Sequence, residues 1–538
     1  MSTTNSAAIF DNEDSSRDDE FERDRQSFDM LAWDRMDSHW DETFSWLRYV
    51  STLDMLASAV AKKAGVPETD VEVLGGGTVG SFNVIYPLRM KGNSLDLLVR
   101  IPIPHVTQLP DERYAVEAGA SRFIRQNTLI PTPTVFYHAS SSENPDIGPL
   151  LVIEKIPNKW SLSEAFTRPR DPEHPDDPFM LDMKLPKERL LKVYHQLAPL
   201  MLQLLRHRFP RIGSLTQTAT RSFDIRSRPV TTNMQAMLAI ANIPQSVLPA
   251  ENETYHTADA WYFACCDMIW APLLFQRNDF VTSADDCRNK YVARQIFRRL
   301  AKEGKLSVFG FEEDTWSEQS KKMKANQSSK KLCPAPAGSG PAAFPLWCDD
   351  LQTGNILVDD TDKVTGFIDW EFTYTAPAQF CLDPPWWLLI ELPEVWILGL
   401  ENFSDRFSKT LPTWLEAVEE AEKGVDLESH YLRQPWSVYM RQSWETGRFW
   451  LNYATRKGWA FDSIYWKFLD ERFFGDRPTD VAKEEYWRSR IDLLTEKERE
   501  AMEPFVERKM NESKGRVFVD EWDEEEVQRR FAEVLFDE

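Results

Sequence analysis

Two aspartates and an asparagine in one short stretch of the chain have the side-chain types that metal-assisted phosphoryl transfer requires. The stretch is LWCDDLQTGNILVDDTDKVTGFIDWE, residues 346–371. Within it, Asp350 and Asn355 lie on one predicted loop, and Asp369 follows an apolar run. A carboxylate can orient an attacking hydroxyl, while an amide oxygen and a second carboxylate can hold Mg²⁺ against phosphates. The alternative is that these residues only cap turns, where Asp and Asn are common.

The elements that must position these side chains are two predicted strands, 355–358 and 364–368, with polar groups at their edges. Because a metal ion is contacted by its ligands at only about 2 Å, the edges of both strands must face the same point. We therefore expect Asp350, Asn355 and Asp369 to converge on one cleft.

The same stretch resembles the aminoglycoside phosphotransferase and choline kinase family, in which a His-x-Asp-Leu-x-x-x-Asn loop precedes an Ile-Asp-Trp-Glu segment. The loop from Asp350 to Asn355 matches, and so does the Ile-Asp-Trp-Glu segment that contains Asp369. The resemblance implies that Asp350 is the catalytic carboxylate and that Asn355 and Asp369 bind Mg²⁺, with ATP or GTP as the nucleotide. Cys348 departs from the family, because it stands where the family usually has a histidine.

A glycine-rich turn between two predicted strands resembles the nucleotide loop of this family. In VEVLGGGTVGSFNVIYPLRM, the turn ends with Gly80, Ser81, Phe82 and Asn83. Glycine lets backbone amides approach phosphate closely. The resemblance therefore implies that these four residues bind nucleotide. A glycine-rich hairpin is also common as an ordinary tight turn, and its position before the other motifs is what supports the nucleotide interpretation.

Two further matches fall in the same N-terminal part. The resemblance places Arg100, which ends a predicted strand, where kinase-like enzymes usually have a lysine that holds the α- and β-phosphates, and Glu117 where a helix carries that lysine's partner. It therefore implies that both residues belong to the nucleotide site, and we expect an Arg100–Glu117 ion pair. The alternatives are a surface arginine and an exposed helix glutamate.

Residues 150–157 resemble the family's hinge, in which backbone groups of Glu154 and Ile156 would meet the nucleotide base. An ordinary buried strand is the alternative there.

The order of predicted elements indicates an α+β chain, and the resemblance implies a protein-kinase-like two-lobed fold with a small antiparallel-sheet N-lobe and a mainly helical C-lobe. Residues 209–215 and 382–389 are similar to those of a large fungal subset of the family. The predicted boundaries are a disordered acidic N-terminus (1–27), an N-terminal helical arm (28–70), a nucleotide-binding N-lobe (71–156), a helical C-lobe (157–496) with a large insertion (about 216–344) that ends in a mobile loop (about 317–343), and a charged C-terminal helical segment (497–538).

The most apolar segment is LDPPWWLLIELPEVWILGL, residues 382–400, which contains three prolines and two glutamates. Burying these charges in a membrane would be costly, so the segment is predicted to be a core helix. Asp383 precedes two prolines, a pattern typical of a helix start, and is predicted to cap that helix. The insertion before the catalytic loop is predicted to shape the acceptor pocket.

The composition restricts the partners of the chain. A formal net charge of -23 repels phosphate backbones and anionic lipid headgroups, so nucleic acid and membranes are not expected as partners. The charge is compatible with a cationic small substrate, although solubility alone also explains it. Six cysteines in 538 residues are typical of a reducing compartment. Because residues 1–30 lack the apolar stretch of a signal peptide, we expect a cytoplasmic or nuclear protein.

Three functions are compatible with these observations. The first is a phosphotransferase that moves the γ-phosphate of ATP or GTP to a hydroxyl of a small molecule. The second is a pseudokinase-like nucleotide-binding module without turnover, for which Cys348 and Arg100 are the reasons. The third, a serine/threonine protein kinase, is disfavoured because the sequence contains no Asp-Phe-Gly or Ala-Pro-Glu segment. The acceptor and the oligomeric state stay open.

Overall fold

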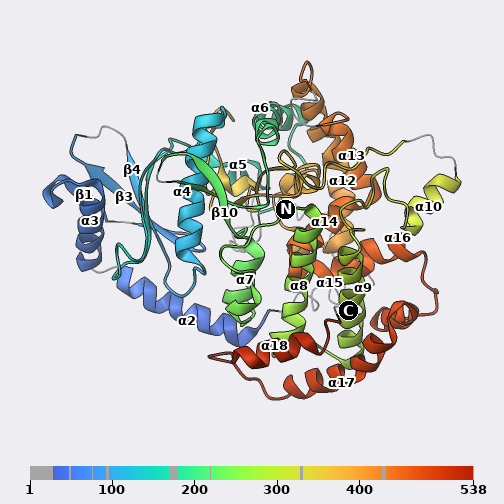
Figure 1. The fold of residues 1–538 in the computed structure, drawn as a ribbon. Helices are drawn as coiled ribbons and strands as arrows, with labels where there is room; N and C mark the ends of the chain where they lie inside the picture. The colour runs from blue at the N-terminus through green and yellow to red at the C-terminus, as the bar shows by residue number, and fades with distance from the viewer. Residues whose placement is uncertain are drawn as a thin grey trace, which may run out of the picture.

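The computed structural model combines helices with antiparallel sheets (Figure 1). It describes residues 28–47, 50–75, 77–92, 96–168, 179–218, 220–326, 331–426 and 432–536. For residues 44–47 and 50–51 only the backbone is described. The predicted disordered N-terminus, residues 1–27, lies outside the described residues.

The N-terminal part is built on a six-stranded antiparallel sheet with the order β1-β3-β4-β6-β5, in which β2 also pairs with β3. In β3, the side chains of Val84, Tyr86 and Leu88 are buried and the intervening residues are more exposed, as expected for a sheet with one face on a core. The strands are β1 (Val71–Val73), β2 (Thr78–Val79), β3 (Asn83–Met90), β4 (Leu97–Pro102), β5 (Val135–Ala139) and β6 (Leu150–Glu154).

Three helices flank this sheet, and they are shown in blue and cyan in Figure 1. The segment predicted to be a helical arm contains α2 (Met30–Leu47) and α3 (Val50–Ala64). Helix α3 packs against β1 and β5, whereas α2 packs against α7 of the larger part. Helix α4 (Pro110–Asn127) contacts β5 and β6 on one side and β9 and β14 on the other, so it connects the two parts of the fold.

The larger part contains two small antiparallel sheets besides its helices. A five-stranded sheet has the order β10-β9-β14-β11-β8, and a three-stranded sheet has the order β13-β12-β7. Their strands are β7 (Trp160–Ser161), β8 (Arg208–Phe209), β9 (Gly213–Gln217), β10 (Phe223–Ser227), β11 (Phe344–Cys348), β12 (Ile356–Val358), β13 (Val364–Phe367) and β14 (Thr373–Thr375). None of these strands exceeds five residues. Such short strands leave little alternation in the sequence, which is why only the strands at 355–358 and 364–368 were predicted in this part of the chain.

The helices of the larger part fill the centre and the right of Figure 1, with α6 at the top and α17 and α18 at the bottom. They are α5 (Leu162–Phe166), α6 (Lys187–Arg206), α7 (Thr232–Ile240), α8 (Ala258–Phe275), α9 (Ala284–Lys302), α10 (Glu318–Ala325), α11 (Ala378–Cys381), α12 (Gly399–Ala421), α13 (Trp436–Thr446), α14 (Arg448–Arg456), α15 (Phe461–Ile464), α16 (Asp470–Phe474), α17 (Glu496–Glu512) and α18 (Glu524–Ala532).

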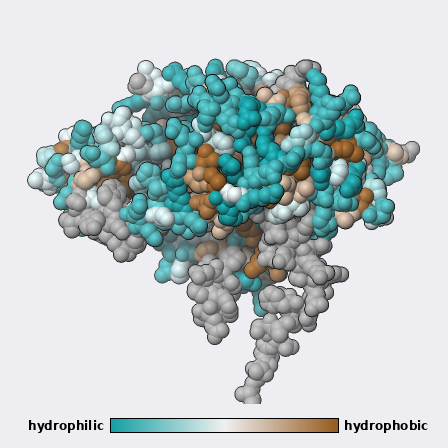
Figure 2. Space-filling model, turned by 90° about the horizontal axis from the view of Figure 1, so that it is seen from below, coloured by the Kyte–Doolittle hydropathy of each residue, from teal (hydrophilic) through white to brown (hydrophobic). Residues whose placement is uncertain are grey.

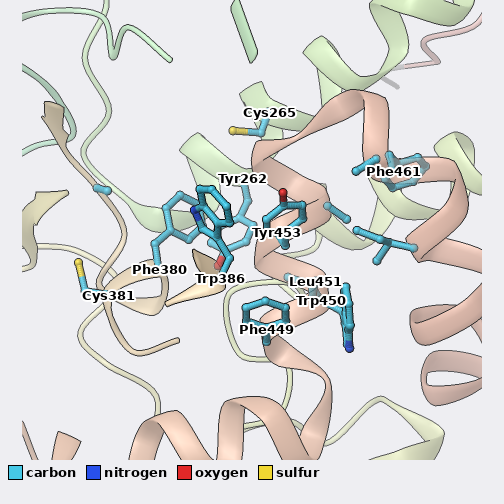
Figure 3. Packing of buried hydrophobic residues seen from close by; sticks show 14 of the residues in the cluster. Tyr262, Cys265, Phe380, Cys381, Trp386, Phe449, Trp450, Leu451, Tyr453 and Phe461 are labelled. Atoms are coloured by element: carbon cyan, nitrogen blue, oxygen red, sulfur yellow. The ribbon is translucent and has the colours of Figure 1, made fainter. Parts of the chain in front are cut away.

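Aromatic side chains dominate the core of the larger part (Figure 3). Tyr262 of α8, Phe380 of α11 and Tyr453 of α14 gather in this core. The ring of Trp450 stacks on that of Phe468, with the ring centroids 4.1 Å apart. A separate cluster of buried aliphatic residues fills the space between the six-stranded sheet and α3. The two parts of the fold therefore have their own cores.

The prediction for residues 382–400 is wrong. Residues 382–400 do not form one core helix; they contain two short 3₁₀ turns, Trp386–Leu389 and Pro393–Val395, because prolines at three positions interrupt the helical hydrogen bonds. Residues 382–390 are buried, whereas Val395 and Ile397 are about half exposed.

The segment predicted to be a mobile loop, at about 317–343, begins with helix α10, in which the Ser320 N–H donates to the Ser317 hydroxyl. Residues 327–330 of this segment lie outside the described residues, and its mobility stays a prediction.

The outer surface seen in Figure 2 is mainly hydrophilic, with hydrophobic side chains in small separate patches. This agrees with the excess of acidic residues in the sequence. None of the helices in the part of the chain that the structure describes has both the length and the apolarity that crossing a membrane requires.

Gly119 marks the closest approach between α4 and β9. A Cβ atom at this position would lie 2.5 Å from the carbonyl oxygen of Leu215. Helix propensity alone would favour alanine over glycine by roughly 1 kcal/mol. We predict that Gly119→Ala nevertheless lowers the free energy of unfolding by about 1–3 kcal/mol, because the backbone of β9 must shift. Urea denaturation monitored by tryptophan fluorescence measures the change.

The matched control is Gly515→Ala, which lies beyond α17 and would place its Cβ with nothing within 4 Å. This variant should unfold as the unmodified chain does. A Gly119→Ala protein that is as stable as the Gly515→Ala protein would contradict the close packing of α4 on β9.

Candidate active site

Strand pairing brings the predicted catalytic loop against the predicted metal ligand. β11 pairs with β14, and the Asp349 N–H donates to the Phe372 carbonyl at 3.0 Å. β12 pairs with β13, and the Ile368 N–H donates to the Asn355 carbonyl at 3.0 Å. The next residue, Asp369, has a φ of 65°, a left-handed conformation that aspartate tolerates better than most residues. The loop and Asp369 therefore lie side by side.

Within the loop, side-chain amides hold both carboxylate oxygens of Asp350. The Asn355 Nδ2 atom donates to the Asp350 carbonyl at 2.9 Å and to its Oδ2 at 3.3 Å. The Gln352 Nε2 atom donates to Oδ1 at 3.1 Å. Because the nitrogen of Asn355 makes these contacts, its amide oxygen is left as a ligand atom.

One cavity of about 470 Å³ is lined by every residue that the sequence analysis assigns to the site. The predicted convergence of Asp350, Asn355 and Asp369 on one cavity is therefore confirmed: Asp350 and Asn355 lie between β11 and β12, and Asp369 follows β13. The side chains and backbone on the sheet side of the cavity include those of Gly80, Ser81, Phe82, Asn83, Arg100, Glu117, Glu154 and Ile156.

The glycine-rich turn is closed by a hydrogen bond from the Gly80 N–H to the Asn83 carbonyl, at 2.8 Å. A Cβ atom on Gly77 would come within 2.6 Å of the Tyr86 ring, so packing requires glycine at that position. On Gly80 it would meet only the Asn83 carbonyl, at an ordinary 3.5 Å. Packing alone therefore does not explain the glycine at position 80.

The end of β6 offers few backbone groups to the cavity. The Glu154 N–H donates to the Thr134 carbonyl at 2.9 Å, and the Lys155 N–H donates to the Asp96 carbonyl at 2.8 Å. Both N–H groups are therefore engaged. A nucleotide base bound at the end of β6 could not use these two N–H groups. The hinge interpretation therefore needs the Glu154 carbonyl and the Ile156 N–H as its contacts.

Arg100 forms the predicted ion pair and two further ones. Its Nη1 lies 2.8 Å from Glu117, and its Nη2 lies 3.0 Å from Asp369 Oδ1 and 2.8 Å from Glu371. The other oxygen of Glu371 pairs with Arg113 of α4 at 2.6 Å. The predicted Arg100–Glu117 pair is confirmed. Sequence analysis missed Glu371 and Arg113; the only available signal was the match of Glu371 to the Ile-Asp-Trp-Glu segment.

Burial changes the proton affinity of the carboxylates in the cavity. It raises the pKa of Asp350 to about 7, with a further contribution from the negative charge of Asp369, while Lys457 opposes the rise. Burial also raises the pKa of Glu117 to about 8, although Arg100 opposes this rise. For Glu371 burial acts in the same direction, but Arg113 and Arg100 outweigh it and hold its pKa below the ordinary value.

A second buried cluster, which sequence analysis missed, contacts Asp349, the residue before Asp350 of the predicted catalytic loop. Asp349 accepts hydrogen bonds from the Thr232 N–H at 3.2 Å and from its hydroxyl at 2.7 Å. Arg456 Nη1 lies 3.3 Å from the other oxygen of Asp349, and the Lys457 ammonium donates to the Thr232 hydroxyl. Although burial opposes ionisation of Asp349, Lys457 and Arg456 hold its pKa below the ordinary value.

The predicted role of Asp383 as a helix cap is wrong. Its Oδ1 accepts a hydrogen bond from the Ser443 hydroxyl at 2.5 Å, and its Oδ2 accepts one from Asn452 Nδ2 at 2.9 Å. No helix begins directly after it, because Pro384 and Pro385 come first. Asp383 instead joins α13 and α14 to the segment that follows β14.

Asp369 and Asn355 have the donor set that a hard cation prefers. Only Oδ1 of Asp369 contacts Arg100, and the side chain is 28% exposed, so its second oxygen is accessible from the cavity. One carboxylate oxygen and one amide oxygen, completed by phosphate and water oxygens, suit Mg²⁺. The residues present therefore fit a single divalent ion.

Comparisons with known proteins give weak similarities. No family model matches the chain. A subtelomeric hrmA-associated cluster protein of Aspergillus fumigatus is 27% identical over 139 residues, which are 26% of this chain and 24% of that protein. The corresponding protein of a second strain is 26% identical over 136 residues, 25% of this chain and 23% of that protein. The chain thus matches about a quarter of the length of these curated relatives.

The structural neighbours include phosphotransferases. A macrolide 2′-phosphotransferase type I has a TM-score of 0.32 and 13% identity. The match covers 79% of this chain and 96% of the chain of that enzyme. APH(2″)-IIIa in complex with GDP and kanamycin has a TM-score of 0.33 and 14% identity, with 78% and 97% coverage. An ethanolamine kinase of Plasmodium vivax has a TM-score of 0.28 and 11% identity, with 79% and 82% coverage. Similarities this low do not assign the chain to a family.

The buried position of Asp349 makes it a test of how the catalytic loop is supported. We predict that Asp349→Asn lowers the free energy of unfolding by about 3 kcal/mol, because it leaves Arg456 buried without its charged partner. Urea denaturation measures the loss. Asp360→Asn is the matched control, since Asp360 lies on the exposed turn between β12 and β13. Equal stability of the two variants would contradict the supporting role of Asp349.

Proposed function

We propose that the chain has a protein-kinase-like two-lobed fold and transfers the γ-phosphate of ATP or GTP to a hydroxyl of a small molecule. The six-stranded sheet would be the nucleotide-binding lobe, and the larger part would carry the catalytic loop. The observation that supports the proposal is the single cavity on which Asp350, Asn355 and Asp369 converge with the glycine-rich turn and the end of β6. Residues that only cap turns would have no reason to gather there.

Asp350 would orient the acceptor hydroxyl and take its proton. A carboxylate whose pKa lies at about 7 is a stronger base than an exposed aspartate and is still substantially ionised at neutral pH. The amides of Gln352 and Asn355 fix its orientation, so that little conformational freedom is lost when the acceptor binds.

Asn355 and Asp369 would hold a Mg²⁺ ion through an amide oxygen and a carboxylate oxygen. Bound there, the ion would neutralise charge on the phosphates of the nucleotide. The backbone of residues 80–83 would lie along the phosphates, and the Glu154 carbonyl and Ile156 N–H would contact the base. Small hydroxyl compounds are more plausible acceptors than nucleic acid, because the formal net charge of -23 repels a polyanion.

A nucleotide-binding module without turnover is the second candidate. The observation that favours it is the contact of Arg100 Nη2 with Asp369 Oδ1 at 3.0 Å, which takes one oxygen of the proposed metal ligand. Cys348 also favours this candidate, because this buried residue of β11 stands where the family that the sequence resembles usually has a histidine.

Two substitutions separate the roles of the aspartates. We predict that Asp350→Asn abolishes phosphoryl transfer but leaves nucleotide affinity within about threefold, because the carboxylate acts on the acceptor and not on the metal. Asp369→Asn should weaken Mg²⁺–ATP binding at least about tenfold, because it removes a charged ligand. Calorimetry measures binding, and consumption of ATP against a panel of hydroxyl compounds measures transfer.

The matched control is again Asp360→Asn, which removes an acidic group outside the cavity and should change neither quantity. Unmodified protein that binds Mg²⁺–ATP and Mg²⁺–GTP but consumes neither would favour the binding module. Loss of nucleotide binding in Asp350→Asn, equal to the loss in Asp369→Asn, would contradict the separate roles. Absence of any nucleotide binding by the unmodified chain would overturn both candidates.

A further inference from the structure

Glu117, Asp369 and Glu371 form a carboxylate cluster in which one oxygen of each residue lies within 4.8 Å of the others. In the described part of the chain this is the one group of histidine, cysteine and acidic side chains with the spacing of a metal site. The cluster already contains a cation, because the guanidinium group of Arg100 pairs with all three residues.

Nearly all the hydrogen-bonding capacity of Arg100 is used inside the protein. Nη1 donates to Glu117, and Nη2 donates to Asp369 and to Glu371. With the amide oxygen of Asn83 turned towards the guanidinium, Nε donates to it at 3.2 Å. A guanidinium has five N–H donors, so at most one is left for a ligand. Arg100 is therefore held in place as a structural cation and has little hydrogen-bonding capacity left for a phosphate.

The surroundings of Arg100 make this arrangement hard to displace. Its side chain is 5% exposed, and those of Glu117 and Glu371 are 4% and 1% exposed. Arg113 neutralises the second oxygen of Glu371 and also donates to Gln235 of α7 at 2.6 Å. A divalent ion placed among these three carboxylates would face the positive charge of Arg100 at close range in a buried, poorly screened environment.

Asp369 alone has an oxygen outside this arrangement. Its Oδ1 contacts Arg100, whereas its side chain is 28% exposed and lines the cavity together with Asn355. A divalent ion bound to the free oxygen of Asp369 and to Asn355 would therefore not need to enter the carboxylate cluster.

We propose that Arg100 is a built-in cation that fills the carboxylate cluster, so that the site takes one divalent ion with its nucleotide and none without it. The nucleotide-dependent half of this statement rests on the proposed function, whereas the exclusion of metal from the cluster rests on the geometry of Arg100. Arg100 would thus set the number of divalent ions that the site binds.

The test counts Mn²⁺ ions bound to the full chain, because Mn²⁺ has oxygen-ligand preferences similar to those of Mg²⁺ and is detected by electron paramagnetic resonance. Without nucleotide, the unmodified chain should show no Mn²⁺ site in the cluster. With a non-hydrolysable ATP analogue it should bind one Mn²⁺ ion per chain. Arg100→Gln removes the cation but keeps a polar side chain, and should bind Mn²⁺ without nucleotide at least about tenfold more tightly than the unmodified chain.

Arg100→Lys is the matched control, because it keeps the positive charge and should bind no additional Mn²⁺. Circular dichroism shows whether the variants are folded. Arg100→Gln protein that is folded and binds no more Mn²⁺ than the Arg100→Lys protein would overturn the inference. So would two Mn²⁺ ions in the nucleotide complex of the unmodified chain.

The two proposals fail in different ways. If the unmodified chain binds no nucleotide but Arg100→Gln gains a Mn²⁺ site, the proposed function is wrong and the role of Arg100 stands. If Arg100→Gln does not fold, the unmodified chain decides alone: a Mn²⁺ site in the absence of nucleotide contradicts the inference, and its absence together with a single nucleotide-dependent ion supports it.

Discussion

A buried network of opposite charges holds the parts of this site together. Arg100 comes from β4, Arg113 and Glu117 come from α4, and Glu371 follows β13, so two consecutive elements meet a third that is distant in sequence through ion pairs. Separating them would leave uncompensated charges in a poorly solvated interior, which costs far more than losing a surface salt bridge. The position of Asp369 relative to the sheet therefore depends on this network.

Helix α7 extends the network to the back of the catalytic loop. Gln235 accepts a hydrogen bond from Arg113 and donates one to the Val106 carbonyl at 2.9 Å. At the start of the same helix, Thr232 donates to Asp349, next to the proposed catalytic residue. Helix α7 lies in the segment predicted to be a large insertion that shapes the acceptor pocket. In the structure it connects α4 with the catalytic loop, and its relation to an acceptor stays a prediction.

Local pattern was sufficient for much of the fold and for the members of the site. The predicted strands around Gly80–Asn83 and before Arg100, and the predicted helix that carries Glu117, correspond to β2, β3, β4 and α4 of an antiparallel sheet part. The residues between Asp350 and Asp369 are close in sequence and joined by short strands, so their convergence followed from local geometry. The prediction for residues 382–400 was wrong because it relied on an apolar run, which does not show whether backbone hydrogen bonds continue. The prolines in this run interrupt them.

The local sequence accounts for the meeting of Asp350, Asn355 and Asp369, because short strands and loops join them, whereas the residues on the sheet side of the cavity were assigned from the family resemblance. The sequence did not determine what those side chains do to one another. Arg113 and Glu371 are 258 positions apart, and Arg456 and Asp349 are 107 apart, and no local pattern indicates which buried charge will find which partner. Only the tertiary structure brought Arg100 into the middle of three carboxylates. That placement follows from desolvation, since buried charges must be paired wherever the fold encloses them.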